Sequence, residues 1–123
     1  MAARIRITPT TRTLQFLEAR GYIADICERR QGPISRDLFG CIDIVAAHPR
    51  KREVLFIQVT SHSHRASRLA KTAEAPKTIQ LLRSGALVEV WTWANEDAQP
   101  HITRLRADRN PEAPREGQGT TTT

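Results

Sequence analysis

The sequence predicts an α/β fold in which helices pack on a mixed central sheet. Two segments near the middle, 41–47 and 53–60, are almost continuously apolar, which is typical of strands inside a sheet covered on both faces. Segments with helical spacing of apolar residues lie before and after them. The predicted order is α-β-β-β-α-β-β, and 123 residues allow one modest core. We therefore expect a single domain over 1–106 and a polar, disordered tail over 107–123.

The N-terminal part begins with a predicted helix over 9–20. Thr8 is suited to cap this helix, because Pro9 follows at the first helical position, and Gly21 marks its end. A half-buried strand is expected over 22–28. The polar segment 29–39 contains a Gly-Pro turn signal and is predicted to be a loop.

The link between the two central strands, 48–52, is short and basic, which favours an antiparallel hairpin. Helical spacing returns over 66–73, and Pro76 opens a second helical piece that ends at Gly85. The last predicted elements are a strand over 86–93 and an edge strand over 101–106.

The charge balance favours a polyanionic partner. Lys and Arg number 19 against 13 Asp and Glu, which gives a net charge of +6, and nucleic acid is the first candidate. No apolar run approaches the roughly 20 residues that span a bilayer, so no membrane partner is expected. Cys27 and Cys41 lie in predicted strands without metal-type spacing, so we expect free thiols in a reducing cytoplasm.

Asp43 is the residue that most needs an explanation, since a carboxylate in an apolar strand is costly to bury unless it is paired or binds a metal. Side chains alternate along strands, so a hairpin can place Asp43 beside Gln58 on one face of the sheet. A carboxylate and an amide oxygen are hard ligands that suit Mg²⁺ or Mn²⁺, and the carbonyl oxygen of Val59 would be a third ligand. The sequence therefore predicts a divalent-metal site between the central strands.

Residues 10–93 resemble a small PD-(D/E)XK nuclease of the archaeal Holliday-junction-resolvase type. The matching features are a helix that ends in Ala-Arg-Gly-Tyr, a strand followed by Arg29 and Arg30, then Gly40-x-x-Asp43-Ile44-x-Ala46 and Ile57-Gln58-Val59. The resemblance implies a restriction-endonuclease-like fold, dependence on Mg²⁺ or Mn²⁺, hydrolysis of DNA phosphodiesters and a homodimer. It also implies that Asp43 takes the place of the family aspartate and Gln58 that of the second acid.

Two family residues are replaced here. Thr60 stands where the family has a lysine and supplies no positive charge, so Lys71 of the following helix is the predicted substitute, with Arg68 next. The acid of the first helix is also missing. Glu28 is preferred over Glu18 for that role, because a strand beside Asp43 could direct the Glu28 carboxylate to the same metal.

The histidines of Ser61-His62-Ser63-His64 provide two ligands, which do not close a zinc site, so we expect them to contact phosphate or substrate. Basic residues of the hairpin and of the following helix are expected to bind phosphates, in a salt-dependent way that does not read sequence. The predicted nucleic-acid contacts are Arg29, Arg36, Arg50, Lys51, Arg52, His62, His64, Arg65 and Arg68.

Structural interpretations stand beside these functional ones. Asp43 could form an ion pair with an arginine of the preceding loop, and Gln58 could be a satisfied buried amide. Asp37 is expected to cap a loop. Trp91 and Trp93 share a strand face, which favours packing in the core or in a dimer over stacking on an unpaired base.

The leading functional hypothesis is a metal-dependent endonuclease for branched or structured DNA, with Asp43, Gln58, Lys71 and Glu28 as its site residues. A second hypothesis keeps the fold as a non-catalytic nucleic-acid-binding module, because the strand lysine and the helix acid are absent. A third is a protein-interaction subunit whose charge serves only solubility.

Overall fold

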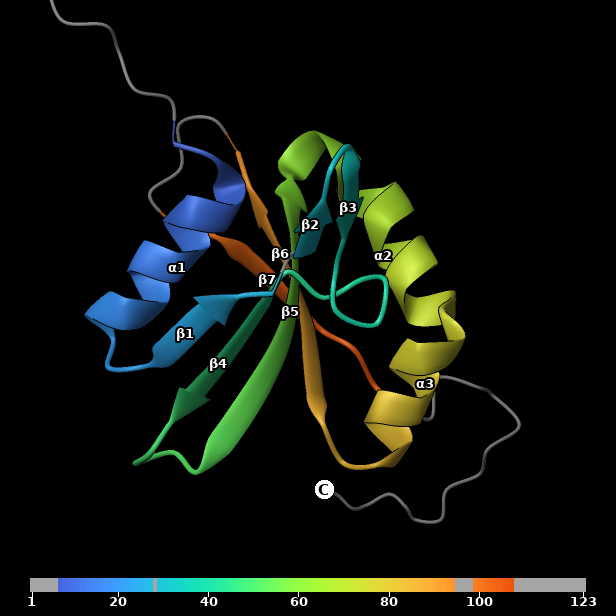
Figure 1. The fold of residues 1–123 in the computed structure, drawn as a ribbon. Helices are drawn as coiled ribbons and strands as arrows, with labels where there is room; N and C mark the ends of the chain where they lie inside the picture. Colours follow the sequence, from blue (N-terminus) through green and yellow to red (C-terminus); the bar gives the residue numbers. More distant parts are fainter. Residues whose placement is uncertain (1–6, 28, 95–98, 108–123) are drawn as a thin grey trace, which may run out of the picture.

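The protein has a five-stranded mixed sheet with helices on both faces (Figure 1). The computed structural model describes residues 7–27, 29–94 and 99–107. The strand order is β1-β4-β5-β6-β7; β5 and β6 are parallel and the other neighbours are antiparallel. These strands are β1 (Ile23–Ile26), β4 (Ile44–His48), β5 (Glu53–Ser61), β6 (Leu87–Trp93) and β7 (His101–Arg104). The α/β class expected from the sequence is therefore confirmed.

The two faces of the sheet carry separate helices and separate apolar cores. On one face α1 (Pro9–Ala19) inserts Leu17 against β4, β5 and β6. On the other, η1 (His62–His64), α2 (Arg65–Glu74) and α3 (Pro76–Arg83) follow β5, and their leucines pack against Val88 and Val90 of β6. Helix α1 begins as expected, since the Thr8 hydroxyl accepts a hydrogen bond from the Thr11 amide at 3.1 Å.

Both tryptophans belong to the core beneath α1. Trp91 and Trp93 are 3% and 4% exposed, and the Phe16 ring meets both edge-on, with centroids 5.6 and 5.9 Å away. Trp93 Nε1 also donates a hydrogen bond to Thr13 Oγ1 at 2.8 Å. The expectation of core packing is confirmed, and rings buried this deeply are not accessible to a nucleic-acid base.

The segment that was expected to be a polar loop, 29–39, contains two further strands. β2 (Arg29–Gln31) and β3 (Ile34–Arg36) pair antiparallel as a separate small sheet. The turn itself was predicted correctly, since Gly32 connects the strands with a positive φ of 59°. Strands this short and polar have no alternating apolar pattern, so the loop prediction was wrong. Cys27 and Cys41 are free thiols, as expected, but neither lies in a strand, because β1 ends at Ile26 and β4 begins at Ile44.

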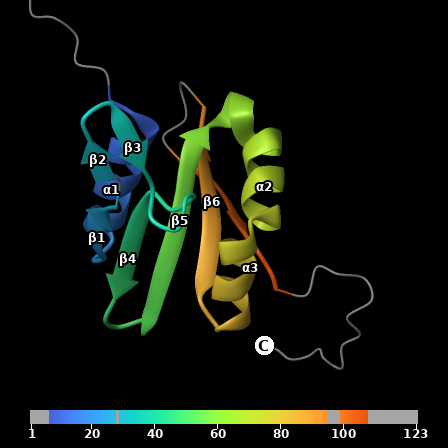
Figure 2. The same ribbon diagram turned by 45° about the vertical axis from the view of Figure 1, so that its right-hand side comes forward.

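The central strands are also less covered than expected. Val54 of β5 is 47% exposed and Ile23 of β1 is 72% exposed, with Ala47 of β4 between them in the register. In Figure 2, α2 and α3 stand over β5 and β6, whereas β1 and β4 lie beyond them. The face of the sheet that α2 and α3 cover is therefore left exposed to solvent near Ile23 and Val54.

Two expectations concern the ends of the chain and membranes. The tail predicted over 107–123 lies, apart from Ala107, outside the described residues. Within the described residues, no helix is long and apolar enough to cross a bilayer.

Candidate functional site

Asp43 and Gln58 lie side by side, as expected from the hairpin. The register pairs Ile44 with Ile57, and the Asp43 amide donates to the Ile57 carbonyl at 2.8 Å, so position 43 stands opposite position 58. Gln58 Nε2 donates to Asp43 Oδ2 at 2.7 Å. Gln58 is 3% exposed and Asp43 is half-buried on the face that α2 covers. The adjacency inferred from strand alternation is confirmed.

Val59 contributes its amide rather than its carbonyl to this pair. Its N–H donates to Asp43 Oδ2 at 2.7 Å, while its carbonyl oxygen accepts from Gln58 Nε2 at 3.3 Å. The Gln58 amide therefore points its NH₂ group at Asp43. To act as a metal ligand, Gln58 would turn its terminal amide so that Oε1 faces the carboxylate side, a rotation about a soft torsion.

A second carboxyl group reaches Asp43 from the preceding loop. Leu38 and Ile42 form an isolated antiparallel bridge, which places Asp37 opposite Asp43. The side chains of the two aspartates are hydrogen-bonded to each other. The pKa of Asp43 is raised from 3.8 to about 7, mainly by burial and also by the Asp37 carboxyl, while the Val59 amide and Arg68 act to lower it. Asp37 was expected to cap a loop. The two aspartates on either side of a glycine turn are the signal in the sequence that indicates this contact.

The cation that acts on Asp43 comes from α2. Arg68 is half-buried and its charge lowers the Asp43 pKa. Lys71, the predicted substitute for the missing strand lysine, is exposed on the same helix. One turn after Arg68, the hydroxyl of Thr72 is buried and has no hydrogen-bond partner among the described residues.

Other predicted site residues are placed as follows. Thr60 is half-buried on the same face of β5 as Gln58. Glu28 lies outside the described residues, as do the side chains of Arg29 and Arg30. Arg36 is exposed at the end of β3, where it lines a hollow together with Asp37.

The predicted phosphate contacts form two groups at opposite ends of β5. At the C-terminal end, His62 contacts Thr92 and His64 contacts Ser61, with nitrogen–oxygen distances of 3.2 and 2.8 Å, while Arg65 donates to Thr103 on β7. At the other end, the hairpin residues 50–52 are exposed. Most of β5 separates this hairpin from Gln58, about 17 Å at about 3.3 Å per residue. The two groups therefore do not converge on Asp43.

The donor set at Asp43 fits a hard divalent cation. Asp37 and Asp43 supply adjacent carboxyl groups and Gln58 supplies an amide, all of which are oxygen donors typical of Mg²⁺ or Mn²⁺ sites. Two carboxylates side by side repel each other unless a proton or a cation lies between them. In the described part of the chain, no group of three His, Cys, Asp or Glu side chains is arranged to hold a metal, so the amide would be needed as a ligand.

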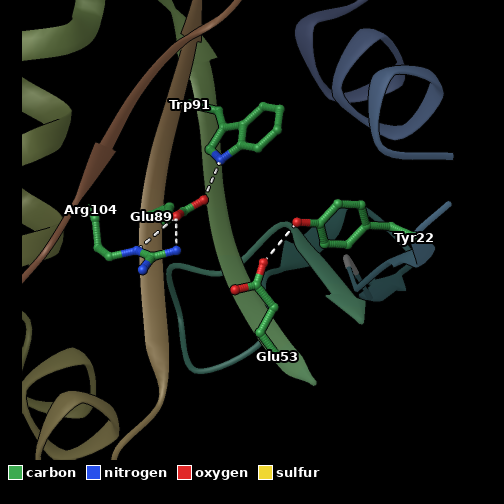
Figure 3. Close-up of polar contacts among 5 residues, drawn as sticks. All are labelled: Tyr22, Glu53, Glu89, Trp91 and Arg104. Carbon is green, nitrogen blue, oxygen red and sulfur yellow. Dashed lines mark hydrogen bonds and ion pairs between the residues drawn. The ribbon is translucent and has the colours of Figure 1, made fainter. Parts of the chain in front are cut away.

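A second polar cluster lies on the α1 face of the sheet (Figure 3). Tyr22 donates to Glu53 at 2.8 Å, and burial with this hydrogen bond raises the Tyr22 pKa to about 12. Glu89, 5% exposed, accepts from Trp91 Nε1 at 2.9 Å and forms an ion pair with Arg104 at 2.8 Å. Each of these polar groups has a partner, so the cluster stabilises the sheet and is not the site of Asp43.

Comparisons of the chain with protein-family models, with curated proteins and with solved structures found no match. The functional argument therefore depends on the geometry of the site.

Proposed function

We propose that this protein is a metal-dependent nuclease of the PD-(D/E)XK type that hydrolyses phosphodiesters in DNA. The observation that supports this most is the convergence of Asp37, Asp43 and Gln58, with the charge of Arg68 acting on Asp43. Carboxyl and amide oxygens that lie together near a cation are what a metal ion and a phosphate require together. A restriction-endonuclease-like topology is part of the same proposal. The mixed five-stranded sheet is compatible with that topology.

In this proposal Asp37, Asp43 and the Gln58 amide oxygen hold Mg²⁺ or Mn²⁺. When bound, the ion lowers the pKa of water and neutralises charge on the phosphate. The hydrogen bond from the Val59 amide to Oδ2 orients the Asp43 carboxylate and does not depend on how the Gln58 amide is turned. Positioning by short hydrogen bonds of this kind lowers the cost of assembling the site.

Arg68 takes the electrostatic role that Thr60 cannot fill. A guanidinium keeps its charge at all working pH values and binds phosphate oxygens through two parallel N–H groups. It does not exchange protons, so Arg68 stabilises the phosphate and leaves proton transfer to water. Lys71, further round the helix, is proposed to contact a neighbouring phosphate, with the catalytic role passing to Arg68.

The proposed substrate is branched or structured DNA, in keeping with the net charge of +6. The hairpin cations 50–52 and the basic start of α2 lie on either side of the site along β5, so they would bind the backbone at a distance from the scissile bond. A homodimer and a cytoplasmic location belong to the proposal. The free thiols of Cys27 and Cys41 suit a reducing compartment.

The experiment that tests this function is cleavage of a four-way junction, a nicked duplex and single-stranded DNA with Mg²⁺ or Mn²⁺. Asp43→Ala is compared with Glu74→Gln, which removes an exposed acid of α2. Cleavage by the wild type and by Glu74→Gln, together with loss in Asp43→Ala, is the expected result. If the wild type cuts no substrate, or Asp43→Ala cuts equally well, the nuclease proposal is wrong.

The second candidate, a non-catalytic DNA-binding module, has one observation in its favour. The Gln58 amide donates to Asp43, so the pair satisfies itself without a metal. Titration with Mn²⁺ separates the two functions, because only the nuclease requires a cation site that disappears in Asp43→Ala. Binding to DNA that weakens with salt separates both from the protein-interaction subunit.

A further inference from the structure

Phe39 stands out among the aromatic residues. The chain has three Phe, one Tyr and two Trp, all within the described residues, and of these Phe39 alone is exposed, at 41%. Its ring leans on Phe56 with centroids 6.5 Å apart and a tilt of 49°. One edge of the ring is thus anchored to β5 while much of its surface faces solvent.

The backbone holds this ring in an unfavourable conformation. Phe39 has a φ of 57° and is followed by Gly40 at 79°. The turn is closed by hydrogen bonds from the Gly40 amide to Asp37 at 2.9 Å and between Leu38 and Ile42 at 2.9 and 3.1 Å. A side chain with a Cβ costs free energy in the left-handed region, where Gly or Asn costs less. Folding alone therefore favours another residue at position 39, and such strain is typical of functional positions.

The strained turn places the ring beside the proposed metal site. Asp37, two residues earlier, contacts Asp43, and Phe56 precedes Gln58 by one strand repeat, about 7 Å, on the same face. Phe39 therefore lies within about one nucleotide's reach of the two carboxyl groups.

Phe39 lines two hollows. One, of about 840 Å³, lies between the Phe39 turn and the junction of α2 and α3, and includes Arg36. The other, of about 260 Å³, runs along α3. Lys77, an exposed cation near the start of α3, lines both. An exposed aromatic ring that lines hollows together with cations is an arrangement suited to bases of single-stranded nucleic acid.

We infer that Phe39 is a stacking platform for an unpaired DNA base next to the phosphate held at Asp43, with Lys77 and Arg36 binding the adjoining phosphates. The inference rests on the proposed nuclease function for the position of that phosphate. A base inside a duplex is covered on both faces, so only an unpaired base can lie on the ring. The substrate class is thereby narrowed to DNA with single-stranded character beside the cleaved bond, such as flaps, gaps and open junctions.

The test measures binding without cleavage. An Asp43→Asn protein in EDTA is titrated with a short labelled single strand and with a blunt duplex of the same sequence. Phe39→Leu keeps apolar contact with Phe56 and removes the aromatic face, and Phe39→Tyr keeps both. We expect Phe39→Leu to weaken single-strand binding about tenfold, which is within the range for loss of one stacked base. Phe39→Tyr should stay within about twofold.

Duplex binding is the internal control, since backbone contacts do not involve the ring. Three outcomes would overturn the inference. The single-strand affinity could be equal for Phe, Leu and Tyr at position 39, the affinity for single strand and duplex could fall equally in Phe39→Leu, or the protein could bind no DNA at all. If Phe39→Leu fails to fold, Phe39→Met is the second variant, since it keeps an apolar side chain without an aromatic face; single-strand affinity equal to that of Phe39 would then overturn the inference. A protein that binds single strands through Phe39 yet cuts no DNA would refute the nuclease and leave the platform standing.

Discussion

Replacement of Asp43 by Asn should stabilise the protein at neutral and alkaline pH. The carboxyl group has a folded-state pKa of about 7 against an ordinary value of 3.8, since it is buried beside Asp37. Asn is the uncharged counterpart of protonated Asp43. Its oxygen still accepts from the Val59 amide, and its NH₂ group can donate to Asp37 where the carboxylic acid did. The variant therefore removes the charge and keeps the hydrogen bonds.

The magnitude follows from the pKa shift. A raised pKa means that the unfolded chain releases its proton first, so the contribution of Asp43 is intact below about pH 4 and is lost as pH rises to about 7. A shift from 3.8 to about 7 corresponds to about 4 kcal/mol at about 1.36 kcal/mol per unit. Solvent access to a half-buried carboxylate reduces the expected value to about 2 kcal/mol.

Urea unfolding of both proteins at a series of pH values measures this effect. Asp43→Asn should match the wild type near pH 4 and exceed its free energy of unfolding by about 2 kcal/mol at pH 8, with an unchanged m-value. Glu74→Gln measures the effect of removing one acid elsewhere on the chain. A difference between Asp43→Asn and the wild type that stays constant with pH, or a variant that is less stable at pH 8, would refute the reasoning.

Four further predictions concern the metal, the cations and the second polar cluster. Mg²⁺ or Mn²⁺ at about 100 times its dissociation constant should stabilise the wild type by about 2.7 kcal/mol and Asp43→Asn much less; equal thermal shifts would speak against a site at Asp43. Arg68→Ala should lower kcat about 100-fold, as for removal of one electrostatic interaction with the transition state, and more than Lys71→Ala does; the reverse order would return the catalytic role to the lysine. Replacing the hairpin cations 50–52 by Ala should weaken duplex binding and reduce the slope of log K against log salt by about 1 for each phosphate that the hairpin no longer binds, whereas an unchanged slope would remove the hairpin from the DNA path. Glu89→Leu should cost about 2–3 kcal/mol in urea unfolding, because Trp91 Nε1 and Arg104 lose their partner, and a cost near zero would show that this buried carboxylate contributes little.

The sequence was sufficient for the central hairpin and for the pairing inside it. A short link forces 41–47 and 53–60 to pair antiparallel, and a period of two then decides which side chains share a face. Asp43 and Gln58 meet for this reason alone, and the structure confirms the contact at 2.7 Å. The helix at 9–20 was predictable for a similar reason, because its cap and its terminating glycine act locally.

The segments before the central hairpin were harder to predict from the sequence. The β2–β3 hairpin was predicted to be a loop, since its residues are polar and its strands are three residues long. The isolated bridge between Leu38 and Ile42, which turns Asp37 towards Asp43, depends on two left-handed residues in succession. Only the glycine of that pair is marked in the sequence, because Phe rarely takes such a conformation.

The sequence by itself determined which oxygen donors the strands carry and that two of them share a face, because strand periodicity is a local property of the chain. The tertiary structure alone decided that Arg68 rather than Lys71 acts on Asp43, that both tryptophans are buried, and that Phe39 remains exposed. These outcomes depend on how α2 packs across β5 and on how far the helices cover the sheet. Such packing is the sum of many weak contacts between distant segments, and no local pattern in the chain records it.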